Sequence, residues 1–541
     1  MSITDDRARD DSANAHDHAD DDSGFAAAVS PSRSAFETAY AAGRPQVAWT
    51  RLVADLETPV SALLKLAPDQ ANSFLLESVE GGTTRGRYSI IGMAPDIIWR
   101  AHGDQPEINR EAATDPEHFS PQATGTLAAL RALLAESRID LPEDLPPMAA
   151  GIFGYMGYDT VRLIERLPSE KPDPLGVPDS IFIRPTVMVI FDAVRDEMTI
   201  VSPTYPSAEV SPETAWRTAC TRLADTVAAL ERPLDQTVDV ERDDATIEGE
   251  PDGITSNTAV QQFKGMVQAA KRYIEAGDIF QVVLSQRFSI PFTLPSFALY
   301  RALRRTNPSP FLFHLNFGGF SIVGSSPEIL VRVRDGEVTV RPIAGTRPRG
   351  ATPQEDARLA DELLADEKEL AEHLMLLDLG RNDAGRVSEI GSVRVTDSFF
   401  LEYYSQVMHI VSNVTGRLAD THDSIDALMA GFPAGTVSGA PKVRAMEIID
   451  EFELEKRGPY AGCVGYFSAD GQMDTCIVLR TAVVKDGVMH IQAGAGVVAD
   501  SVPESEHAEC ENKAKALFKA AEEAERLARQ RSFHGSFKNK R

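Results

Sequence analysis

Cysteine and long apolar runs are the first things that this sequence lacks. It has four cysteines in 541 residues and no Cys-x-x-Cys pair, a usage typical of free thiols in a reducing compartment. No apolar run approaches the roughly 18 residues that span a bilayer. The N-terminus also lacks the basic start and apolar core of a signal peptide. We therefore expect a cytoplasmic protein that does not associate with a membrane.

Positive charge is also scarce. The chain has 54 Lys and Arg against 81 Asp and Glu, for a formal net charge of −27. Such a chain is a poor nucleic-acid binder, because attraction to phosphates needs a basic face. If the substrate is an anion, positive charge must be concentrated locally. The segment VRPIAGTRPRG, residues 340–350, carries three arginines and is one candidate.

The composition changes along the chain and divides it into five segments. Residues 1–40 are rich in Asp and are predicted to be disordered, and 231–257 are an acidic, apolar-poor linker. Two folded regions are predicted at 45–230 and 258–526, and the basic tail 527–541 is expected to fray. Strand-like segments come in runs rather than alternating with helices, which favours an α+β fold over a doubly wound sheet.

The second folded region shows helix and strand patterns along most of its length. Hydrophobic periodicity predicts an amphipathic helix at its start and strands through most of its length. Helices are expected at 258–276, 354–378, 422–430, 440–452 and 503–526. Strands are expected at 279–288, 320–324, 328–333, 337–343, 393–400, 407–416, 461–468, 475–484 and 488–493.

Two Glu-x-x-Glu pairs lie in predicted helices. Glu369 and Glu372 are three residues apart, as are Glu506 and Glu509, so each pair shares a helix face. Two such pairs offer the hard oxygen donors that Mg²⁺ prefers. Solvated helix faces are the alternative, since Glu-x-x-Glu arises often by chance in a chain with 81 acidic residues. The spacing alone leaves both interpretations open.

The segment VMHIQAGAGVVAD places Gly494-x-Gly496-x-x-Ala499 directly after a predicted strand. This is the spacing of a dinucleotide-binding turn, but such a turn opens a βαβ unit. Here one helix and a tail follow, with no second strand. The better interpretation is that the glycines let the backbone approach a small ligand closely.

Three further polar features have both a functional and a structural explanation. The Gly- and Pro-rich run 431–442 precedes a predicted helix, whose free N–H groups could bind an anion or simply be capped. His409 lies in a strand-like run, where a histidine is usually structural. Arg480 interrupts an apolar strand, and a buried arginine there would need an anionic partner.

Taken together, these segments resemble the chorismate-utilising enzymes, and most closely the large subunits of anthranilate synthases. LLES (75–78) and GRYSIIG are similar in the N-terminal region. The segments that carry the resemblance between 258 and 518, in the family's order, are GDIFQVVLSQRF, PIAGTRPRG, DEKELAEHLMLLDLGRND, QVMHIVS, FPAGTVSGAPK, YAGCVGYF, CIVLRT, AGAGVV and P-x-x-E-x-x-E-x-x-x-K. The resemblance implies antiparallel β-sheets packed as a sandwich, with helices on the outside.

The resemblance also implies an activity and its residues. Such a lyase adds ammonia to C2 of chorismate and eliminates pyruvate, giving anthranilate for tryptophan biosynthesis. It implies that Mg²⁺ is held by Glu372 and Glu509, with Glu369 and Glu506 close by. The implied catalytic residues are Glu328, as general acid to the C4 hydroxyl, His409, Thr436 and Gln281. The implied substrate-binding residues are Gly345, Thr346, Tyr460, Arg480, Gly494, Ala495, Gly496 and Lys513.

Two positions discriminate among members of the family. Relatives that add water to chorismate carry a lysine base where this chain has Gln281. Aminodeoxychorismate synthases typically carry lysine where this chain has Ala344, and that amine can bond to C2 and direct amination to C4. Neutral residues at both positions favour anthranilate as the product. Aminodeoxychorismate synthase component I is the nearest alternative, and a tryptophan-sensing subunit without turnover is another.

The resemblance further implies feedback inhibition by L-tryptophan. Two departures from the family bear on it: Phe311-Leu312 stand where many relatives have Tyr-Met, and Arg85 where many have Trp. No cysteine lies in a nucleophile elbow, so ammonia is expected from a separate glutamine amidotransferase small subunit, in a heterotetramer of two large and two small subunits. The implied tryptophan-binding residues are Leu76, Glu77, Ser78, Asn307, Pro308, Ser309, Pro310 and Phe311.

Overall fold

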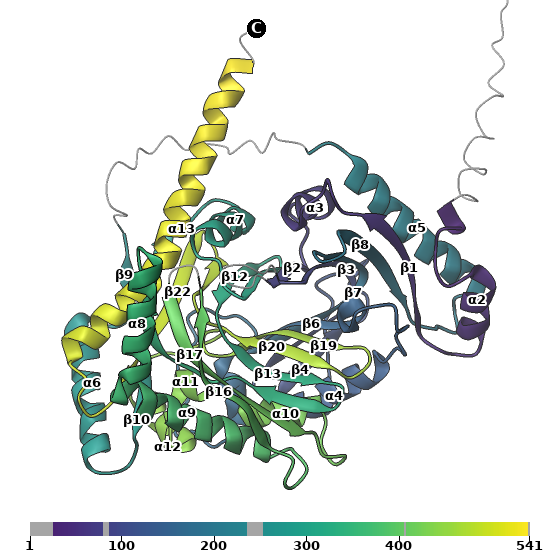
Figure 1. Cartoon of the computed structure of the whole chain (residues 1–541). Helices are drawn as coiled ribbons and strands as arrows, with labels where there is room; N and C mark the ends of the chain where they lie inside the picture. Colours follow the sequence, from purple (N-terminus) through teal and green to yellow (C-terminus); the bar gives the residue numbers. More distant parts are fainter. Residues whose placement is uncertain (1–24, 79–85, 235–252, 405–406, 539–541) are drawn as a thin grey trace, which may run out of the picture.

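The computed structural model describes residues 25–78, 86–234, 253–404 and 407–538, with side chains up to residue 529. Its strands form one antiparallel hydrogen-bonded network (Figure 1). The network divides at β3 (Tyr88–His102) and β7 (Ser180–Asp192), which pair along most of their length. The register shifts between Pro95 and Ile97. On one side of this bulge β7 pairs with β8, and on the other with β6, so two sheets diverge from the shared strands.

The order of strands in each sheet follows from the pairings. The first sheet runs β1 (Gln46–Val53), β8 (Glu197–Thr204), β7, β3, β2 (Ser73–Ser78), β11 (Phe311–Asn316), β12 (Phe320–Ser326), β21 (Thr481–Lys485), β22 (Val488–Val497) and β10 (Gln281–Pro291), with β9 (Thr255–Ser256) and β18 (Gly439–Ala440) paired to β10. The second runs β5 (Ser120–Pro121), β4 (Gln105–Asn109), β3, β7, β6 (Gly151–Met156), β19 (Cys463–Ser468), β20 (Met473–Ile477), β13 (Ile329–Arg334), β14 (Glu337–Val340), β17 (Val407–Arg417) and β16 (Arg394–Tyr403), with β15 (Ile343–Pro348) paired to β17.

Alternate residues of these strands enter two different cores, because successive side chains of a strand point to opposite faces. Phe74 on β2 packs in an aromatic-rich core that gathers strands of both sheets, and its ring lies 4.7 Å from that of Phe153 on β6. Its neighbour Leu75 joins the larger core, which includes residues of the outer helices. This arrangement confirms the predicted α+β sandwich with helices outside.

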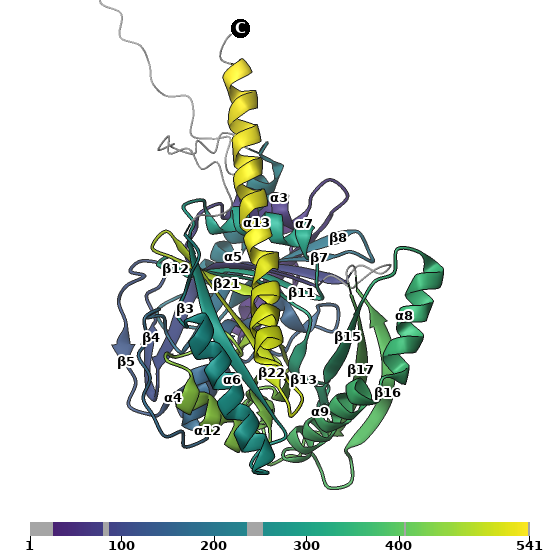
Figure 2. The same ribbon diagram turned by 90° about the vertical axis from the view of Figure 1, so that its left-hand side faces the viewer.

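Helices cover the outer faces of the sheets. In Figure 2, α13 and α6 lie together on one side, and α8 and α9 lie against β15, β16 and β17. No helix in the described ranges is long and apolar enough to cross a bilayer. The helices are α2 (Arg33–Ala41), α3 (Pro59–Leu66), α4 (Thr126–Glu136), α5 (Pro212–Glu231), α6 (Val260–Glu275), α7 (Ser296–Thr306), α8 (Pro353–Ala365), α9 (Glu367–Gly385), α10 (Ser424–Gly431), α11 (Gly435–Ser438), α12 (Lys442–Phe452) and α13 (Pro503–Lys538), with 3₁₀ turns at η1 (Pro147–Ala149) and η2 (Tyr158–Leu163).

The single helix predicted at 354–378 is wrong, because the structure has two helices there. Asp366 separates α8 from α9, and its side chain accepts hydrogen bonds from the backbone N–H groups of Lys368 at 3.1 Å and Glu369 at 3.3 Å. This is an N-cap, which starts a helix rather than continuing one. The break sets the direction of α9 and therefore the position of its two glutamates.

The predicted strand 475–484 is also two strands, since β20 and β21 are separated by Val478, Leu479 and Arg480. Arg480 has φ of +48°, a left-handed conformation that an extended strand does not contain. The prediction that Arg480 lies within a strand is therefore wrong. It lies in a sharp bend that directs its side chain independently of the strand faces.

The predicted boundaries at the chain ends and between the two regions also need correction. Disorder was predicted for 1–40, but residues 33–41 form α2, whose Phe36 ring packs 5.1 Å from that of Trp216. At the other end, α13 continues past 526 to Lys538. Residues 255–256 of the predicted linker pair with β10 as β9. In each sheet a block of strands from 45–230 pairs with a block from 258–526, through β2 and β11 in the first sheet and β6 and β19 in the second, so the two regions share their sheets.

Candidate active site

The site residues predicted from the sequence come together where the two sheets and two helices meet. Gln281 on β10 and Gly496 on β22 lie on neighbouring strands of the first sheet. Thr346 on β15 pairs with His409 on β17 in the second sheet. The glutamates are on α9 and α13, which pack on those same strands.

Gln281 connects the first sheet to α9. Its side-chain Nε2 donates to Glu372 Oε1 at 3.1 Å. A Cβ at Gly496 would lie 2.8 Å from that nitrogen, closer than such atoms approach, so the glycine makes room for the amide. The buried Oε1 of Gln281 has no hydrogen-bond partner among the described residues. A neutral amide with a free acceptor therefore faces the site.

Four carboxylates lie near one another on α9 and α13. Burial raises the pKa of Glu372, and the negative charges of Glu369 and Glu509 raise it further. Burial likewise raises the pKa of Glu506, with Glu509 adding to the shift. Such mutual repulsion marks a place where a cation would be stabilised. The donors are hard oxygens on two rigid helices, so their chemistry fits Mg²⁺.

Nearby groups already engage these carboxylates. Glu369 accepts from Arg347 at 3.1 Å, and Lys513 pairs with Glu509 at 2.7 Å. In the described part of the chain, no three acidic, His or Cys side chains are arranged to hold a metal ion. Ligation by these glutamates would therefore require their side chains to exchange partners.

Glu328 is a buried carboxyl between β12 and β13. Thr436, on α11, donates to its two oxygens from Oγ1 at 3.1 and 3.2 Å. Burial outweighs this hydrogen bond and one from the backbone N–H of Ile343, and raises the pKa of Glu328 to about 8. The group is thus largely protonated at neutral pH and can act as an acid.

Residues 345–346 hold the imidazole ring of His409 at its Nδ1 atom. Its Nδ1 lies 3.0 Å from the carbonyl oxygen of Gly345 and 3.0 Å from Thr346 Oγ1. A carbonyl oxygen only accepts, so Nδ1 carries the proton. Burial lowers the pKa of His409 to about 4, so the ring is neutral. Its buried Nε2, without a partner among the described residues, is left as a proton acceptor.

Gly345 occupies a β-bulge. The register between β15 and β17 shifts between Ala344 and Thr346, and Gly345 has φ of +69°. This conformation favours glycine. A Cβ there would also lie 3.3 Å from Glu369 Oε2. The bulge thus presents the carbonyl to His409 and brings the backbone close to the glutamates.

Two cationic groups lie beyond the bulge. Arg480 is largely buried, which lowers the pKa of its guanidinium, and no carboxylate among the described residues pairs with it. Lys513 donates from Nζ to the carbonyl oxygen of Gly494 at 2.9 Å. A Cβ at Gly494 would lie 2.7 Å from Tyr460 Oη. Lys513, Gly494 and Tyr460 therefore lie together, and a buried arginine such as Arg480 can bind an anionic ligand.

The arginines of 340–350 do not form the local positive charge that the sequence offered as a candidate. Arg347 pairs with Asp366 at 2.7 Å and with Glu369. Arg349 pairs with Asp356 at 2.7 Å, and Arg341 pairs with Glu402. All three neutralise nearby carboxylates, so that interpretation is wrong, whereas Arg480 has no carboxylate partner among the described residues.

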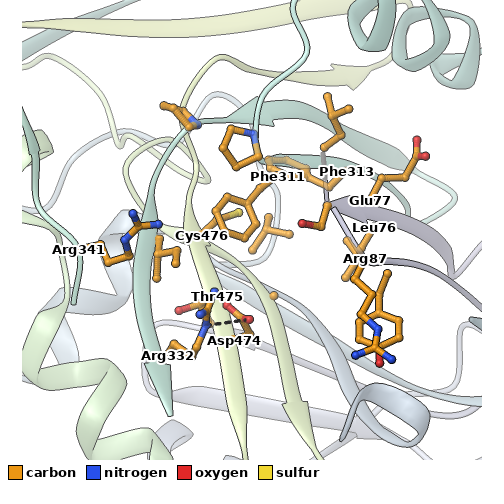
Figure 3. Close-up of a pocket in the computed structure, with 18 of the residues that line it drawn as sticks. Leu76, Glu77, Arg87, Phe311, Phe313, Arg332, Arg341, Asp474, Thr475 and Cys476 are labelled. Carbon is orange, nitrogen blue, oxygen red and sulfur yellow. Dashed lines mark hydrogen bonds and ion pairs between the residues drawn. The ribbon is translucent and has the colours of Figure 1, made fainter. Parts of the chain in front are cut away.

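Five of the eight residues predicted to bind tryptophan lie elsewhere and line a cavity of about 730 Å³ between the two sheets (Figure 3). Ser78 on β2 pairs with Phe311 on β11, and both line the cavity with Leu76, Glu77 and Pro310. The residues 307–309 are not among its lining. Arg85 lies outside the described residues.

Glu77 does not present a free carboxylate to this cavity. Arg304, on α7, donates to its two oxygens at 2.7 and 3.1 Å, and Tyr300 donates to it as well. Sequence reasoning missed the opposite wall, which belongs to the second sheet. There Asp474 on β20 is paired with Arg332 at 3.2 Å, beside Thr475 and Cys476. The sequence signal for this wall was an acidic residue, Asp474, within a short apolar strand.

Comparison with known proteins gives the family. The profile of the family described as chorismate binding enzyme matches residues 73–519. The chain belongs to the chorismate-binding enzymes. Anthranilate synthase component 1 from Cereibacter sphaeroides is 58% identical to this chorismate-binding enzyme over 494 residues, covering 91% of this chain and 98% of that protein.

Solved structures agree with this assignment. The crystal structure of anthranilate synthase component I from Streptococcus pneumoniae has a TM-score of 0.68 at 36% identity, covering 86% of this chain and 98% of that one. The menaquinone-specific isochorismate synthase from Escherichia coli has a TM-score of 0.64 at 20% identity, covering 88% and 95%. At this identity, the likeness to the isochorismate synthase shows the fold alone.

Proposed function

We propose that this chain is the chorismate-binding component of an anthranilate synthase, a lyase of tryptophan biosynthesis that converts chorismate and ammonia to anthranilate and pyruvate. The observation that carries the choice of product is the neutral pair Ala344 and Gln281. Ala344 is buried on β15, and Gln281 donates to Glu372. Neither offers an amine or base to the substrate, so ammonia itself is the nucleophile at C2. The names of the relatives support the same activity.

In the first step the C4 hydroxyl leaves as ammonia adds at C2. Hydroxide is a poor leaving group, so an acid must protonate it as the bond breaks. Glu328 supplies that proton, because its pKa of about 8 keeps it protonated at neutral pH. Thr436 holds the carboxyl in place and stabilises the carboxylate that remains.

In the second step the C2 proton is removed and the side chain leaves C3 as the enolate of pyruvate, which takes up a proton to give pyruvate as the ring becomes aromatic. His409 assists this transfer through its free Nε2, since Nδ1–H is fixed on the carbonyl of Gly345. Its low pKa, about 4, keeps the acceptor unprotonated across the working range. Thr346 fixes the plane of the ring from the same side.

The substrate is a dianion, and the site offers complementary groups. Arg480 and Tyr460 bind the pyruvyl carboxylate, and Lys513 and the backbone of Gly494, Ala495 and Gly496 complete the pocket, with Gly345. Glu372 and Glu509 would hold Mg²⁺, with Glu369 and Glu506 beside them. Bound Mg²⁺ would offset the charge of the ring carboxylate and fix its geometry.

Two further properties belong to this proposal. Ammonia reaches the site from a glutamine amidotransferase small subunit, in a cytoplasmic heterotetramer of two large and two small subunits. L-Tryptophan binds in the cavity between the sheets and inhibits the enzyme. The cavity is large enough for an indole and is lined by both charged and apolar groups.

The test is turnover by the purified chain alone. With chorismate, Mg²⁺ and an ammonium salt at pH 8.5, we expect fluorescent anthranilate to form. Glutamine should replace ammonium only after the amidotransferase subunit is added. Tryptophan binding without any turnover in either condition would instead identify a sensing subunit and refute the proposal.

A further inference from the structure

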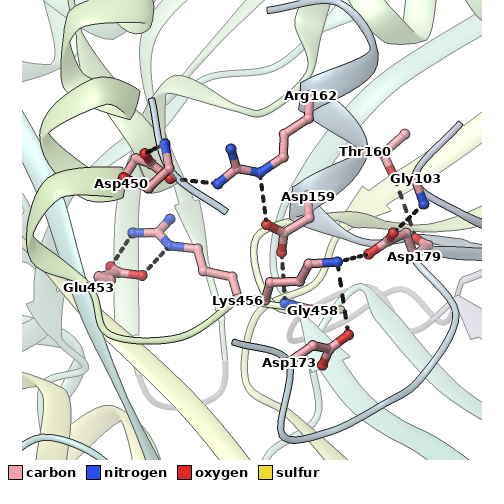
Figure 4. A network of polar contacts seen from close by, with 12 residues as sticks. Gly103, Asp159, Thr160, Arg162, Asp173, Asp179, Asp450, Glu453, Lys456 and Gly458 are labelled. Atoms are coloured by element: carbon pink, nitrogen blue, oxygen red, sulfur yellow. Dashed lines mark hydrogen bonds and ion pairs between the residues drawn. The ribbon is translucent and has the colours of Figure 1, made fainter. Parts of the chain in front are cut away.

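Arg457 is a fully enclosed arginine to which the proposed chemistry gives no part. It follows α12, and its residue is 2% exposed. Its Nε donates to Glu453 Oε2 at 2.8 Å and its Nη2 to Glu453 Oε1 at 2.6 Å. This bidentate contact between two buried groups is a strong, charge-assisted geometry for an arginine and a carboxylate. Figure 4 shows Glu453 beside the network of Asp159, Arg162 and Asp450.

The guanidinium also binds two backbone carbonyls of other elements. Nη2 donates to the carbonyl oxygen of Val283 on β10 at 2.7 Å. Nη1 donates to that of Val437 on α11 at 2.7 Å. Val283 is two residues from Gln281, and Val437 directly follows Thr436. The arginine therefore fixes the backbone beside two proposed site residues that are far apart in sequence.

A third connection runs to Tyr460, three residues further along the chain. The guanidinium carbon of Arg457 lies 5.6 Å from the centre of the Tyr460 ring. It also lies 4.6 Å from the centre of the ring of Tyr158, which is in η2 of the N-terminal region. The segment between Arg457 and Tyr460 is anchored, because the backbone N–H of Gly458 donates to Asp159 at 3.2 Å. The ring of Tyr460 is thus packed against a fixed cation.

Glu453 extends the same connection to β10. It accepts from the backbone N–H of Ser285 at 2.8 Å and from its hydroxyl at 2.9 Å. Gln492 on β22 donates to that hydroxyl at 2.8 Å. The ion pair is therefore held from β10, β22 and α12 at once.

We propose that Arg457, held by Glu453, is a positioning residue for the amination of chorismate. It sets Gln281, Thr436 and Tyr460 relative to one another. The inference rests on the function proposed above for the same site. Its central consequence concerns Thr436, whose hydrogen bond to Glu328 depends on the place of α11.

Only arginine can make this set of contacts. Its planar guanidinium has donors in fixed directions, which here reach one carboxylate and two carbonyls. A lysine keeps the charge but makes fewer contacts from a single nitrogen. Arg457→Lys therefore leaves Glu453 paired and releases at least one of the carbonyls of Val283 and Val437.

The test compares Arg457→Lys with a matched control, Arg184→Lys. Arg184 is another buried arginine with a bidentate carboxylate, donating to Asp96 at 2.8 and 2.7 Å, and its guanidinium lies 3.9 Å from the ring centre of Tyr205. Arg184 is on β7 and Asp96 on β3, and neither is among the proposed site residues. The readout is kcat and the pH profile of kcat/KM for chorismate, at constant free ammonia.

We expect Arg457→Lys to lower kcat roughly 10- to 100-fold, the size of effect that a displaced site residue produces. We also expect the basic limb of kcat/KM to move to higher pH. The reason is that the Thr436 hydrogen bond lowers the pKa of Glu328, so weakening it raises that pKa. Arg184→Lys should lose stability and keep the wild-type kcat and profile.

An unchanged kcat and an unmoved limb in folded Arg457→Lys would overturn the inference. If that variant does not fold, Glu453→Gln gives the same test, because it keeps the shape and weakens the pair; a wild-type profile there would also overturn it. Absence of anthranilate with the wild-type chain would refute the proposed function instead, so the two failures are distinguishable.

Discussion

At the scale of single residues, burial changes what the same side chains can do. Glu328 was expected to be the general acid only because of the resemblance. Nothing in its segment, residues 325–330, indicates a pKa of about 8. The shift comes from the walls around the carboxyl, which belong to distant segments. His409 is similar: its position was predictable, but its tautomer follows from the Gly345 carbonyl.

The pH dependence of turnover follows from Glu328. The group must be protonated to act, so kcat/KM for chorismate should fall as the pH rises through about 8, when free ammonia is held constant. Glu328→Gln should lose activity at least roughly 100-fold, the usual range for removing a general acid. Glu337→Gln, an exposed carboxyl on β14, is the control. A flat profile to pH 10 would contradict the assignment.

The same carboxyl should affect stability. Its pKa is higher in the folded protein than the ordinary value near 4.5, so the folded state binds the proton more tightly. Its effect on stability is therefore most favourable at low pH and is lost as the pH rises toward about 8. Glu328→Gln should unfold at a higher temperature than wild type at pH 9, with a smaller difference at pH 5. Thermal unfolding measured at both values decides this, and a difference that does not grow with pH is the contrary result.

At the scale of elements, the sequence predicted whether a segment is a helix or a strand better than it predicted where that element begins and ends. The helix expected at 354–378 is divided by Asp366, and nothing in an acid-rich helical stretch distinguishes a capping aspartate from any other. The bend at Arg480 was hidden in an apolar run. The close approach of a small ligand to the glycines of β22 stays a prediction, and the side chains that do approach them, Gln281 and Tyr460, come from segments remote in sequence.

These neighbours make Gly496→Ala a specific test of β22. The new Cβ would lie 2.8 Å from Gln281 Nε2. The amide is the end of a flexible side chain, so it can move away and release Glu372. We expect a loss of stability below about 1 kcal/mol and a fall in kcat of at least roughly tenfold. Gly319→Ala, where a Cβ meets nothing within 4 Å, is the control. Full activity would show that the Gln281–Glu372 contact is dispensable.

At the scale of the whole molecule, the two sheets enclose a cavity that no local pattern could reveal. Its walls include residues 76–78, 87–88 and 310–313 on one side and 464–466 and 474–476 on the other. The predicted division into an N-terminal and a catalytic region is not expressed as separate sheets, because β2 pairs with β11 and β6 with β19. A ligand in this cavity would therefore contact strands of both regions.

Filling the cavity should uncouple inhibition from catalysis. Ser78→Leu places an apolar side chain where Ser78 lines the wall, so tryptophan should inhibit at least roughly tenfold more weakly while the uninhibited rate changes little. Ser120→Leu, at an exposed position on β5, is the control. Inhibition curves with ammonium as the nitrogen source measure both effects. Unaltered inhibition in Ser78→Leu would place the tryptophan site elsewhere.

The position of the new amino group tests the central claim most directly. Chorismate is incubated with the purified chain, Mg²⁺ and ¹⁵N-ammonium, without any added lyase, and the product is identified by chromatography and nitrogen-coupled NMR. The account predicts anthranilate, with nitrogen on the ring carbon next to the one that bears the carboxylate, together with an equal amount of pyruvate. Aminodeoxychorismate, with nitrogen at C4 and the enolpyruvyl group retained, would contradict it.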